Sequence, residues 1–262
     1  MTETLERILY LASAGKTTEA RLINQYFQLD VAASASLVMA SGGSVTPATT
    51  VPTTAKSLEI VSAGTNDTAA GNNARTIRIF GVDANFEAVD QTVSMNGLTA
   101  VALPTQMFRV NGWEVATAGT GTTNESQITL RESGGGSAWN ITPAGEGRSM
   151  HMSYSCPVGK VAYMIQATFQ SGTAATAETT APTVFNIRRS KVTPGLTDVR
   201  VSTVANYQSR AHSQVTSCPG ERWSNPVLPG ETIFVRVSNV DATNVRRTLG
   251  QWTILEIDAE AL

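Results

Sequence analysis

The amino-acid sequence predicts an all-β protein, with two antiparallel β-sandwich (jelly-roll-like) domains and a short helical N-terminal arm. Two observations carry this prediction. Apolar and polar residues alternate over Thr76–Phe80 and again over Ala88–Met95, with turn residues between them, which is the pattern of a β-hairpin. Gly, Asn, Asp, Ser and Thr then interrupt the rest of the chain at similar intervals, as short antiparallel strands require.

Residues 1–56 are expected to form the arm and its linker. Apolar residues near the N-terminus recur at spacings of about three and four, which predicts one or two short amphipathic helices. The residues concerned are Leu5, Ile8, Leu9, Ile23, Tyr26 and Phe27. A helix this short is marginal in water, so it needs a surface on its own body or on another subunit. Residues 31–56 are rich in Ala, Ser, Gly, Thr and Pro and are predicted to be a linker or an extended arm.

The β body is expected to divide into two sandwich domains, over residues 57–145 and 146–262. The segment Pro143–Gly147 marks the boundary, because it concentrates turn-forming residues between two series of alternating strands. Each series has short turns and dense strands, which favours packed antiparallel sheets over a βαβ fold.

The composition excludes several classes of function. Charged residues make up 15% of the 262 residues, against roughly 25% in typical soluble domains. The formal net charge of −2 gives no basic field, so we expect neither nucleic acid nor a membrane as partner. No apolar run reaches about 18 residues, and the acidic start at Thr2–Glu6 is unlike a secretory signal. A surface rich in uncharged polar groups suits dense packing against other subunits.

Few residues suit catalysis, and we predict no catalytic, cofactor or metal site. The stretch Ser13–Thr17 ends like a phosphate-binding loop, but Tyr10 stands where that motif needs its first glycine. The chain has no Gly-x-Ser-x-Gly elbow that could present a nucleophilic serine to His151 or His212. Neither histidine has the paired ligand spacing of a zinc site, so structural roles are favoured for both.

Three groups of Asn and Asp residues leave two interpretations open. They are Asn66 with Asp67, Asp83 with Asn85, and Asp241 with Asn244. Such groups either bind calcium or cap their own turns, and turn chemistry is favoured. Cys156 and Cys218 likewise either form a disulfide or stay reduced, and the reduced state is favoured.

Residues 58–257, about three-quarters of the chain, resemble a known family. The segments that carry the resemblance follow one another in order. They include Leu58–Gly71, Ala74–Asn85, Thr92–Gly97, Ile141–Gly147 and Pro229–Val237. Together they resemble a family of virion structural proteins of tailed bacteriophages, marine phages especially. The first 56 residues do not match the family, and the family has no catalytic residues to carry over.

The resemblance and the composition together predict a non-enzymatic virion protein, assembled in the host cytoplasm. Within that class we favour a capsid decoration or cement protein, which forms a homo-oligomer, a trimer being favoured, and binds the major capsid protein or other virion subunits. The six apolar residues of the arm would then dock on a neighbouring subunit. The alternatives are a tail, baseplate or fibre component, and a receptor- or glycan-binding module.

Overall fold

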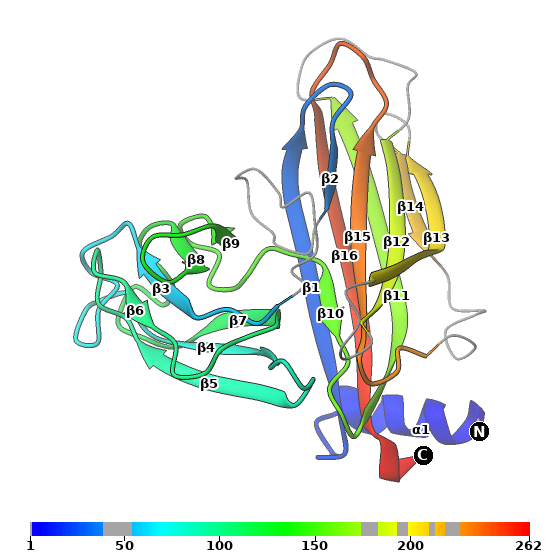
Figure 1. Ribbon diagram of the computed structural model, residues 1–262, viewed down its shortest axis with the longest axis horizontal. Helices are drawn as coiled ribbons and strands as arrows, with labels where there is room; N and C mark the ends of the chain where they lie inside the picture. The colour runs from blue at the N-terminus through cyan, green and yellow to red at the C-terminus, as the bar shows by residue number, and fades with distance from the viewer. Residues whose placement is uncertain (1, 39–53, 174–182, 193–198, 210–212, 218–225) are drawn as a thin grey trace. The chain divides into compact units, whose positions relative to one another are not determined.

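A computed structural model describes residues 2–38, 54–173, 183–192, 199–209, 213–217 and 226–262 (Figure 1). The chain divides into two compact units, which we describe separately. Unit 1 joins residues 1–37 to residues 155–262, and unit 2 comprises residues 38–154. Unit 2 is therefore an insertion in the sequence of unit 1. Strands predominate, and the one α-helix of the described residues is near the N-terminus, which confirms the all-β prediction.

Among its described residues, unit 1 contains one α-helix, one short 3₁₀ helix and two antiparallel sheets. Its elements are α1 (Thr2–Ser13), β1 (Ala20–Val31), β2 (Ser36–Val38), β10 (Ser153–Ser155, at the boundary between the units), β11 (Lys160–Thr173), β12 (Thr183–Val192), β13 (Val199–Ser209), β14 (Ser213–Ser217), β15 (Glu231–Asn239), β16 (Arg246–Asp258) and the 3₁₀ helix η2 (Ala259–Ala261). One sheet has the order β1-β16-β11-β14. The other has the order β10-β15-β12-β13, and β2 also pairs with β15.

These orders define a jelly roll. If β2 and β10 are counted together as the second of eight strand positions along unit 1, the two sheets read 1-8-3-6 and 2-7-4-5. That interleaving of two Greek keys in a two-sheet sandwich is the jelly-roll arrangement. Unit 2 falls between β2 and β10, so it interrupts the second strand position.

The core of unit 1 lies between its two sheets. Along β1, the side chains that face the core alternate with outward ones, and Ile23, Phe27 and Val31 are buried. The rings of Phe169 on β11 and Phe185 on β12 stack with centroids 4.8 Å apart, which joins the two sheets. The Trp252 indole is also buried, and its Nε1 donates a hydrogen bond of 2.6 Å to Oε1 of Gln25.

Unit 2 is a second sandwich. Its strands are β3 (Leu58–Ser62), β4 (Ala74–Val82), β5 (Ala88–Ser94), β6 (Val101–Ala102), β7 (Arg109–Ala118), β8 (Ile128–Glu132) and β9 (Ala138–Thr142). They form the sheets β6-β3-β8-β9 and β5-β4-β7. The expected hairpin is present, because β4 pairs antiparallel with β5 in the register Thr76↔Ser94 to Val82↔Ala88. Trp113 and Trp139 belong to one buried cluster with the aliphatic residues of both sheets.

The structure corrects the prediction for the N-terminal segment. The residues expected to form a second helix, Ile23, Tyr26 and Phe27, lie in β1, which pairs with β16 along its whole length from Ala20↔Ile257 to Val31↔Arg246. The period of two set by Ile23, Gln25, Phe27, Leu29 and Val31 outweighs the helical spacing, because these side chains complete the core of the jelly roll. The first 37 residues thus belong to unit 1 rather than to a separate arm.

Candidate assembly site at the N-terminal helix

Helix α1 owes its position to an apolar stripe. Leu5, Ile8, Leu9 and Ala12 repeat at spacings of three and four, so they share one face of the helix. Leu5 is only 1% exposed, and the other three pack against the same buried cluster. The apolar stripe predicted from the sequence is therefore present, and within the chain it packs against a sheet of unit 1.

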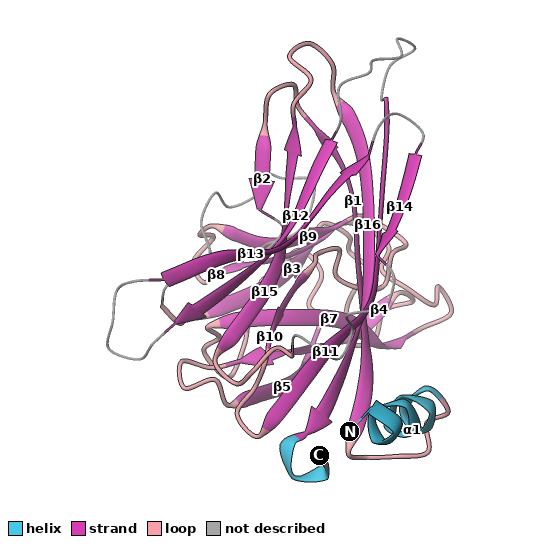
Figure 2. Ribbon diagram, turned by 90° about the vertical axis from the view of Figure 1, so that its right-hand side faces the viewer, coloured by secondary structure: helices cyan, strands magenta, loops and turns pink. Residues whose placement is uncertain are grey.

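The seat of α1 is the outer face of the β1-β16-β11 sheet, at the end where Ala20 pairs with Ile257. Leu255 and Ile257 on β16 and Tyr163 on β11 are buried there together with Ala20. Loss of water around the Tyr163 ring raises the pKa of its hydroxyl. In both ribbon views α1 lies at the end of unit 1 that also holds the C-terminus (Figures 1 and 2).

The other three residues proposed for docking are not on this helix. Ile23 and Phe27 face the core of the jelly roll and are 6% and 1% exposed. Tyr26 lies on the outer face of β1 and is half-buried. Of the six side chains, the structure brings Leu5, Ile8 and Leu9 together and separates them from the remaining three.

One residue that the sequence did not single out points away from the seat of α1. Tyr10 is 64% exposed, the most exposed large apolar side chain among the described residues. In the sequence, Tyr10 is recognisable as the large apolar residue on the polar face of the helix, away from the stripe of Leu5, Ile8, Leu9 and Ala12. With Leu5 held against the sheet, Tyr10 is the large apolar group that α1 leaves exposed.

The Asn and Asp turns serve the fold rather than a metal ion. Asp67 is fully buried, and its carboxylate accepts hydrogen bonds from Oγ of Ser62 (2.5 Å) and from the backbone N–H groups of Ala74 (3.0 Å), Glu125 (2.9 Å) and Ser126 (3.4 Å). These donors tie two loops of unit 2 together. A carboxylate surrounded by N–H and O–H groups has no free oxygen lone pairs to offer calcium. The carboxylate of Asp83 likewise accepts from the N–H groups of Asn85 and Glu87.

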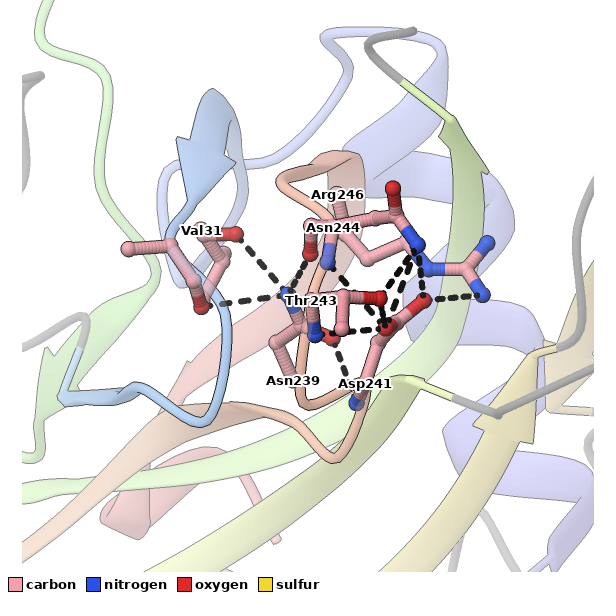
Figure 3. A network of polar contacts seen from close by, with 7 residues as sticks. Val31, Asn239, Asp241, Thr243, Asn244 and Arg246 are labelled. Atoms are coloured by element: carbon pink, nitrogen blue, oxygen red, sulfur yellow. Dashed lines mark hydrogen bonds and ion pairs between the residues drawn. The ribbon is translucent and has the colours of Figure 1, made fainter. Parts of the chain in front are cut away.

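Asp241 plays the same part in unit 1 (Figure 3). Its Oδ1 accepts from the backbone N–H groups of Thr243 (3.0 Å) and Asn244 (3.1 Å), and its Oδ2 faces Nη2 of Arg246 at 3.3 Å. Nδ2 of Asn239 donates to the carbonyl oxygens of Val31 and Asn244, which joins this turn to the end of β1. The Arg246 side chain is fully buried.

The structural role predicted for His151 agrees with its surroundings. The ring is 2% exposed, and Nε2 donates to the carbonyl oxygen of Val110 at 3.1 Å. Burial lowers the pKa of His151 to about 4, since the charged ring would lose its water. Arg109 nearby in sequence is also buried: its Nη1 donates to the carbonyl of Phe108, and burial lowers its pKa to about 9.

The described residues test several other predictions only in part. Within the described residues, no group of three or more His, Cys, Asp or Glu side chains could hold a metal ion. The side chains of Trp113, Trp139 and Trp252 are buried in the cores. Cys156 is buried. Cys218, His212 and Trp223 lie outside the described residues, so the reduced state favoured for the two cysteines stays a prediction. No helix in the described ranges is both long and apolar enough to cross a membrane.

Comparison with known proteins gives weak structural likenesses only. No protein-family model and no curated protein matches the chain. The structure of infectious bursal disease virus, Gt strain, contains a chain similar to this one, with 11% identity, a TM-score of 0.24, and coverage of 91% of this chain and 71% of that chain. For the Gx strain of the same virus the values are 12%, 0.24, 91% and 70%.

These scores are too low to establish a common fold, so the jelly roll rests on the strand order alone. No family model matches the chain, so the resemblance to virion proteins of tailed bacteriophages stays a prediction. The class that the fold defines is a two-unit β-sandwich protein with a jelly roll.

Proposed function

We propose that this chain is a structural protein of a virus particle and acts as a capsid decoration or cement protein. The observation that carries the proposal is the strand order of unit 1, because the two-sheet jelly roll is a recurrent architecture of viral capsid domains. Lectins and cupins share that architecture, so the fold must be weighed with the chemistry of the chain.

The chemistry favours assembly over turnover. The buried carboxylates of Asp67 and Asp241 are occupied by hydrogen-bond donors, and buried His151 makes a structural hydrogen bond. These groups stabilise the fold and are not arranged around a substrate. The chain would bind the major capsid protein or another virion subunit as a homo-oligomer, with a trimer favoured. The outward face of α1, with Tyr10 at its centre, is the proposed docking contact.

The experiment compares particles that contain this chain with particles made without it. A cement protein adds subunit contacts to the closed shell, so particles that lack it should release their genome at a lower temperature. Adding the purified protein back should restore the original release temperature. Equal release temperatures with and without the chain would contradict the proposal.

The second candidate is a tail, baseplate or fibre component that contacts the host. The insertion of unit 2 in the sequence of the jelly roll favours this candidate, because the loops of a second sandwich could bind a receptor. In that case, particles without the chain would fail to adsorb to host cells while their release temperature stayed unchanged.

A further inference from the structure

The outer face of the jelly-roll sheet carries an unusual set of side chains. Beyond the seat of α1, three rows cross β1, β16 and β11, and we call them together the amide face. By register the rows are Asn24, Thr253 and Gln166; Tyr26, Gln251 and Thr168; and Gln28, Leu249 and Gln170. All five amide side chains of this face are exposed.

The amide face contains no charged side chain. It is bounded at one end by the apolar row under α1, which includes Leu22, Leu255 and Tyr163. At the other end Asp30 and Arg247 form an ion pair of 2.9 Å, so their charges largely cancel. Because the face is neutral and the whole protein has a low charge, electrostatic attraction does not favour an anionic or a cationic partner there.

Amide groups make such a face complementary to itself. Each Gln or Asn side chain has two N–H donors and one carbonyl acceptor, so any two of them can form reciprocal hydrogen bonds. Two copies of a neutral face also approach each other without charge repulsion. Leu249 stands in the middle strand, 37% exposed, with Gln28 and Gln170 directly across from it on the two neighbouring strands. Leu249 thus supplies an apolar contact in the row beside the Asp30–Arg247 pair, with an amide on each side of it.

We propose that the amide face binds the amide face of a second copy of this chain. In such a symmetric contact the same patch serves both subunits, so Leu249 approaches Leu249 of the other copy. Three strands at about 4.8 Å spacing and five residues at about 3.3 Å rise give roughly 240 Å² per copy. The total of roughly 480 Å² for two copies is below the area of a stable isolated dimer, about 1,200 Å².

A contact of this size is weak in free solution and becomes effective where copies already stand side by side. That use of the face rests on the proposed function, since a particle is what holds the copies together. The contact itself does not, because it can be measured on the purified full-length protein. Failure to find the chain in particles and failure of the face to pair are therefore separate results.

The test is sedimentation of the full chain over a concentration series up to about 1 mM, a range chosen for contacts at the low end of interface size. The wild-type protein should show concentration-dependent self-association. Leu249→Lys and Leu249→Glu should each weaken it at least tenfold, because like charges then meet where position 249 of one copy approaches position 249 of the other. An equimolar mixture of the two variants should associate again, because unlike charges now face each other.

The matched control is Leu98→Lys, which changes a 63% exposed leucine of unit 2 in the same way. It should leave self-association unchanged. Absence of concentration dependence in the wild-type protein would overturn the proposal. So would self-association that survives both Leu249 variants, or a mixture of them that stays monomeric.

Discussion

Buried carboxylates in this protein tie loops to the ends of strands. Asp67 is the clearest case, since its two oxygens accept hydrogen bonds from four donors and so tie two loops of unit 2 together. Substituting Asp67→Ala leaves those donors buried without acceptors, which costs on the order of 2–4 kcal/mol. We expect faster hydrogen exchange throughout unit 2, measured by mass spectrometry on the full-length protein.

The control for this prediction is Asp83→Ala. The Asp83 carboxylate also caps a turn, but it lies near the surface, where water replaces the lost acceptor. Its effect on hydrogen exchange should be confined to residues 83–87. If both variants changed exchange equally, the loops would not depend on the buried carboxylate.

His151 makes the stability of unit 2 depend on pH. Its pKa falls from the ordinary 6.5 to about 4 in the folded protein, so the unfolded chain binds the proton more tightly. The stabilising contribution is complete above pH 6.5 and is lost as the pH falls from 6.5 towards 4, by up to about 3 kcal/mol. Thermal unfolding measured across this range should show the decrease, and His151→Asn should flatten it. An unchanged slope in that variant would assign the pH dependence to other groups.

The carboxyl of Glu59 also makes the stability of unit 2 depend on pH, in a lower pH range than His151. Its pKa is lowered by the backbone N–H of Gly134, and also by Arg131 and the N–H of Gly135. A lowered carboxyl pKa contributes stability above the ordinary value of 4.5, and this contribution is lost as the pH falls below that value. The histidine and carboxyl contributions therefore separate along the pH axis.

At the scale of elements, α1 has one face that binds its own sheet and one that is free to bind elsewhere. Leu5→Ala removes a buried side chain from the seat and should cost about 2–3 kcal/mol, seen as faster hydrogen exchange within α1. Tyr10→Ala should leave exchange unchanged and weaken binding to particles. Leu98→Ala, with nearly the same exposure on unit 2, is the control for particle binding. Normal binding by Tyr10→Ala would remove α1 from the docking contact.

The structure shows which changes near the N-terminus can test docking without damaging the fold. Removing residues 1–30 would delete almost all of β1, which pairs with β16 and buries Ile23 and Phe27. Such a truncation would damage the jelly roll itself. Point substitutions on α1 therefore separate docking from folding, whereas the long truncation does not.

Strand alternation allowed much of the fold to be predicted, but not the role of the N-terminal segment. The hairpin of β4 and β5 was predictable because its pairing is local and its turn residues are adjacent. Strand β1 was predicted as helix because Ala20, Leu22, Ile23, Tyr26 and Phe27 also fit a helical spacing. Its partner β16 lies more than 200 residues further along the chain, so no local signal decided between the two patterns.

The sequence likewise predicted only part of the candidate site. The apolar stripe of α1 was visible as Leu5, Ile8 and Leu9, but its seat was not, since Tyr163 and Leu255 come from distant strands. The amide face was invisible for the same reason. Gln28, Gln170 and Leu249 look like isolated polar and apolar residues until three strands place them in one row.

For the whole molecule, the two units have different relations to the chain. The strands of unit 2 are continuous in sequence, so its sandwich could be expected from one series of alternating segments. The jelly roll of unit 1 is split by that insertion, and its first strand pairs with its last. The expected boundary near residue 145 is close to the observed junction at Tyr154 and Ser155, whereas the N-terminal boundary falls at residues 37 and 38.

The proposed function assigns both units to a virus particle, where many copies of the chain repeat with the symmetry of the shell. A sandwich protein of low charge, with an exposed helix face in unit 1 and the proposed self-complementary amide face, is suited to such a lattice. The contacts of one copy would be weak, and repetition would make them effective.

The most direct test is cryo-electron microscopy of purified particles that carry this chain with a C-terminal label. The proposal predicts label density at positions repeated over the shell with capsomer symmetry. Label confined to the tail or to one vertex would contradict the decoration role and favour the host-contact alternative. Absence of the chain from purified particles would contradict a virion role altogether.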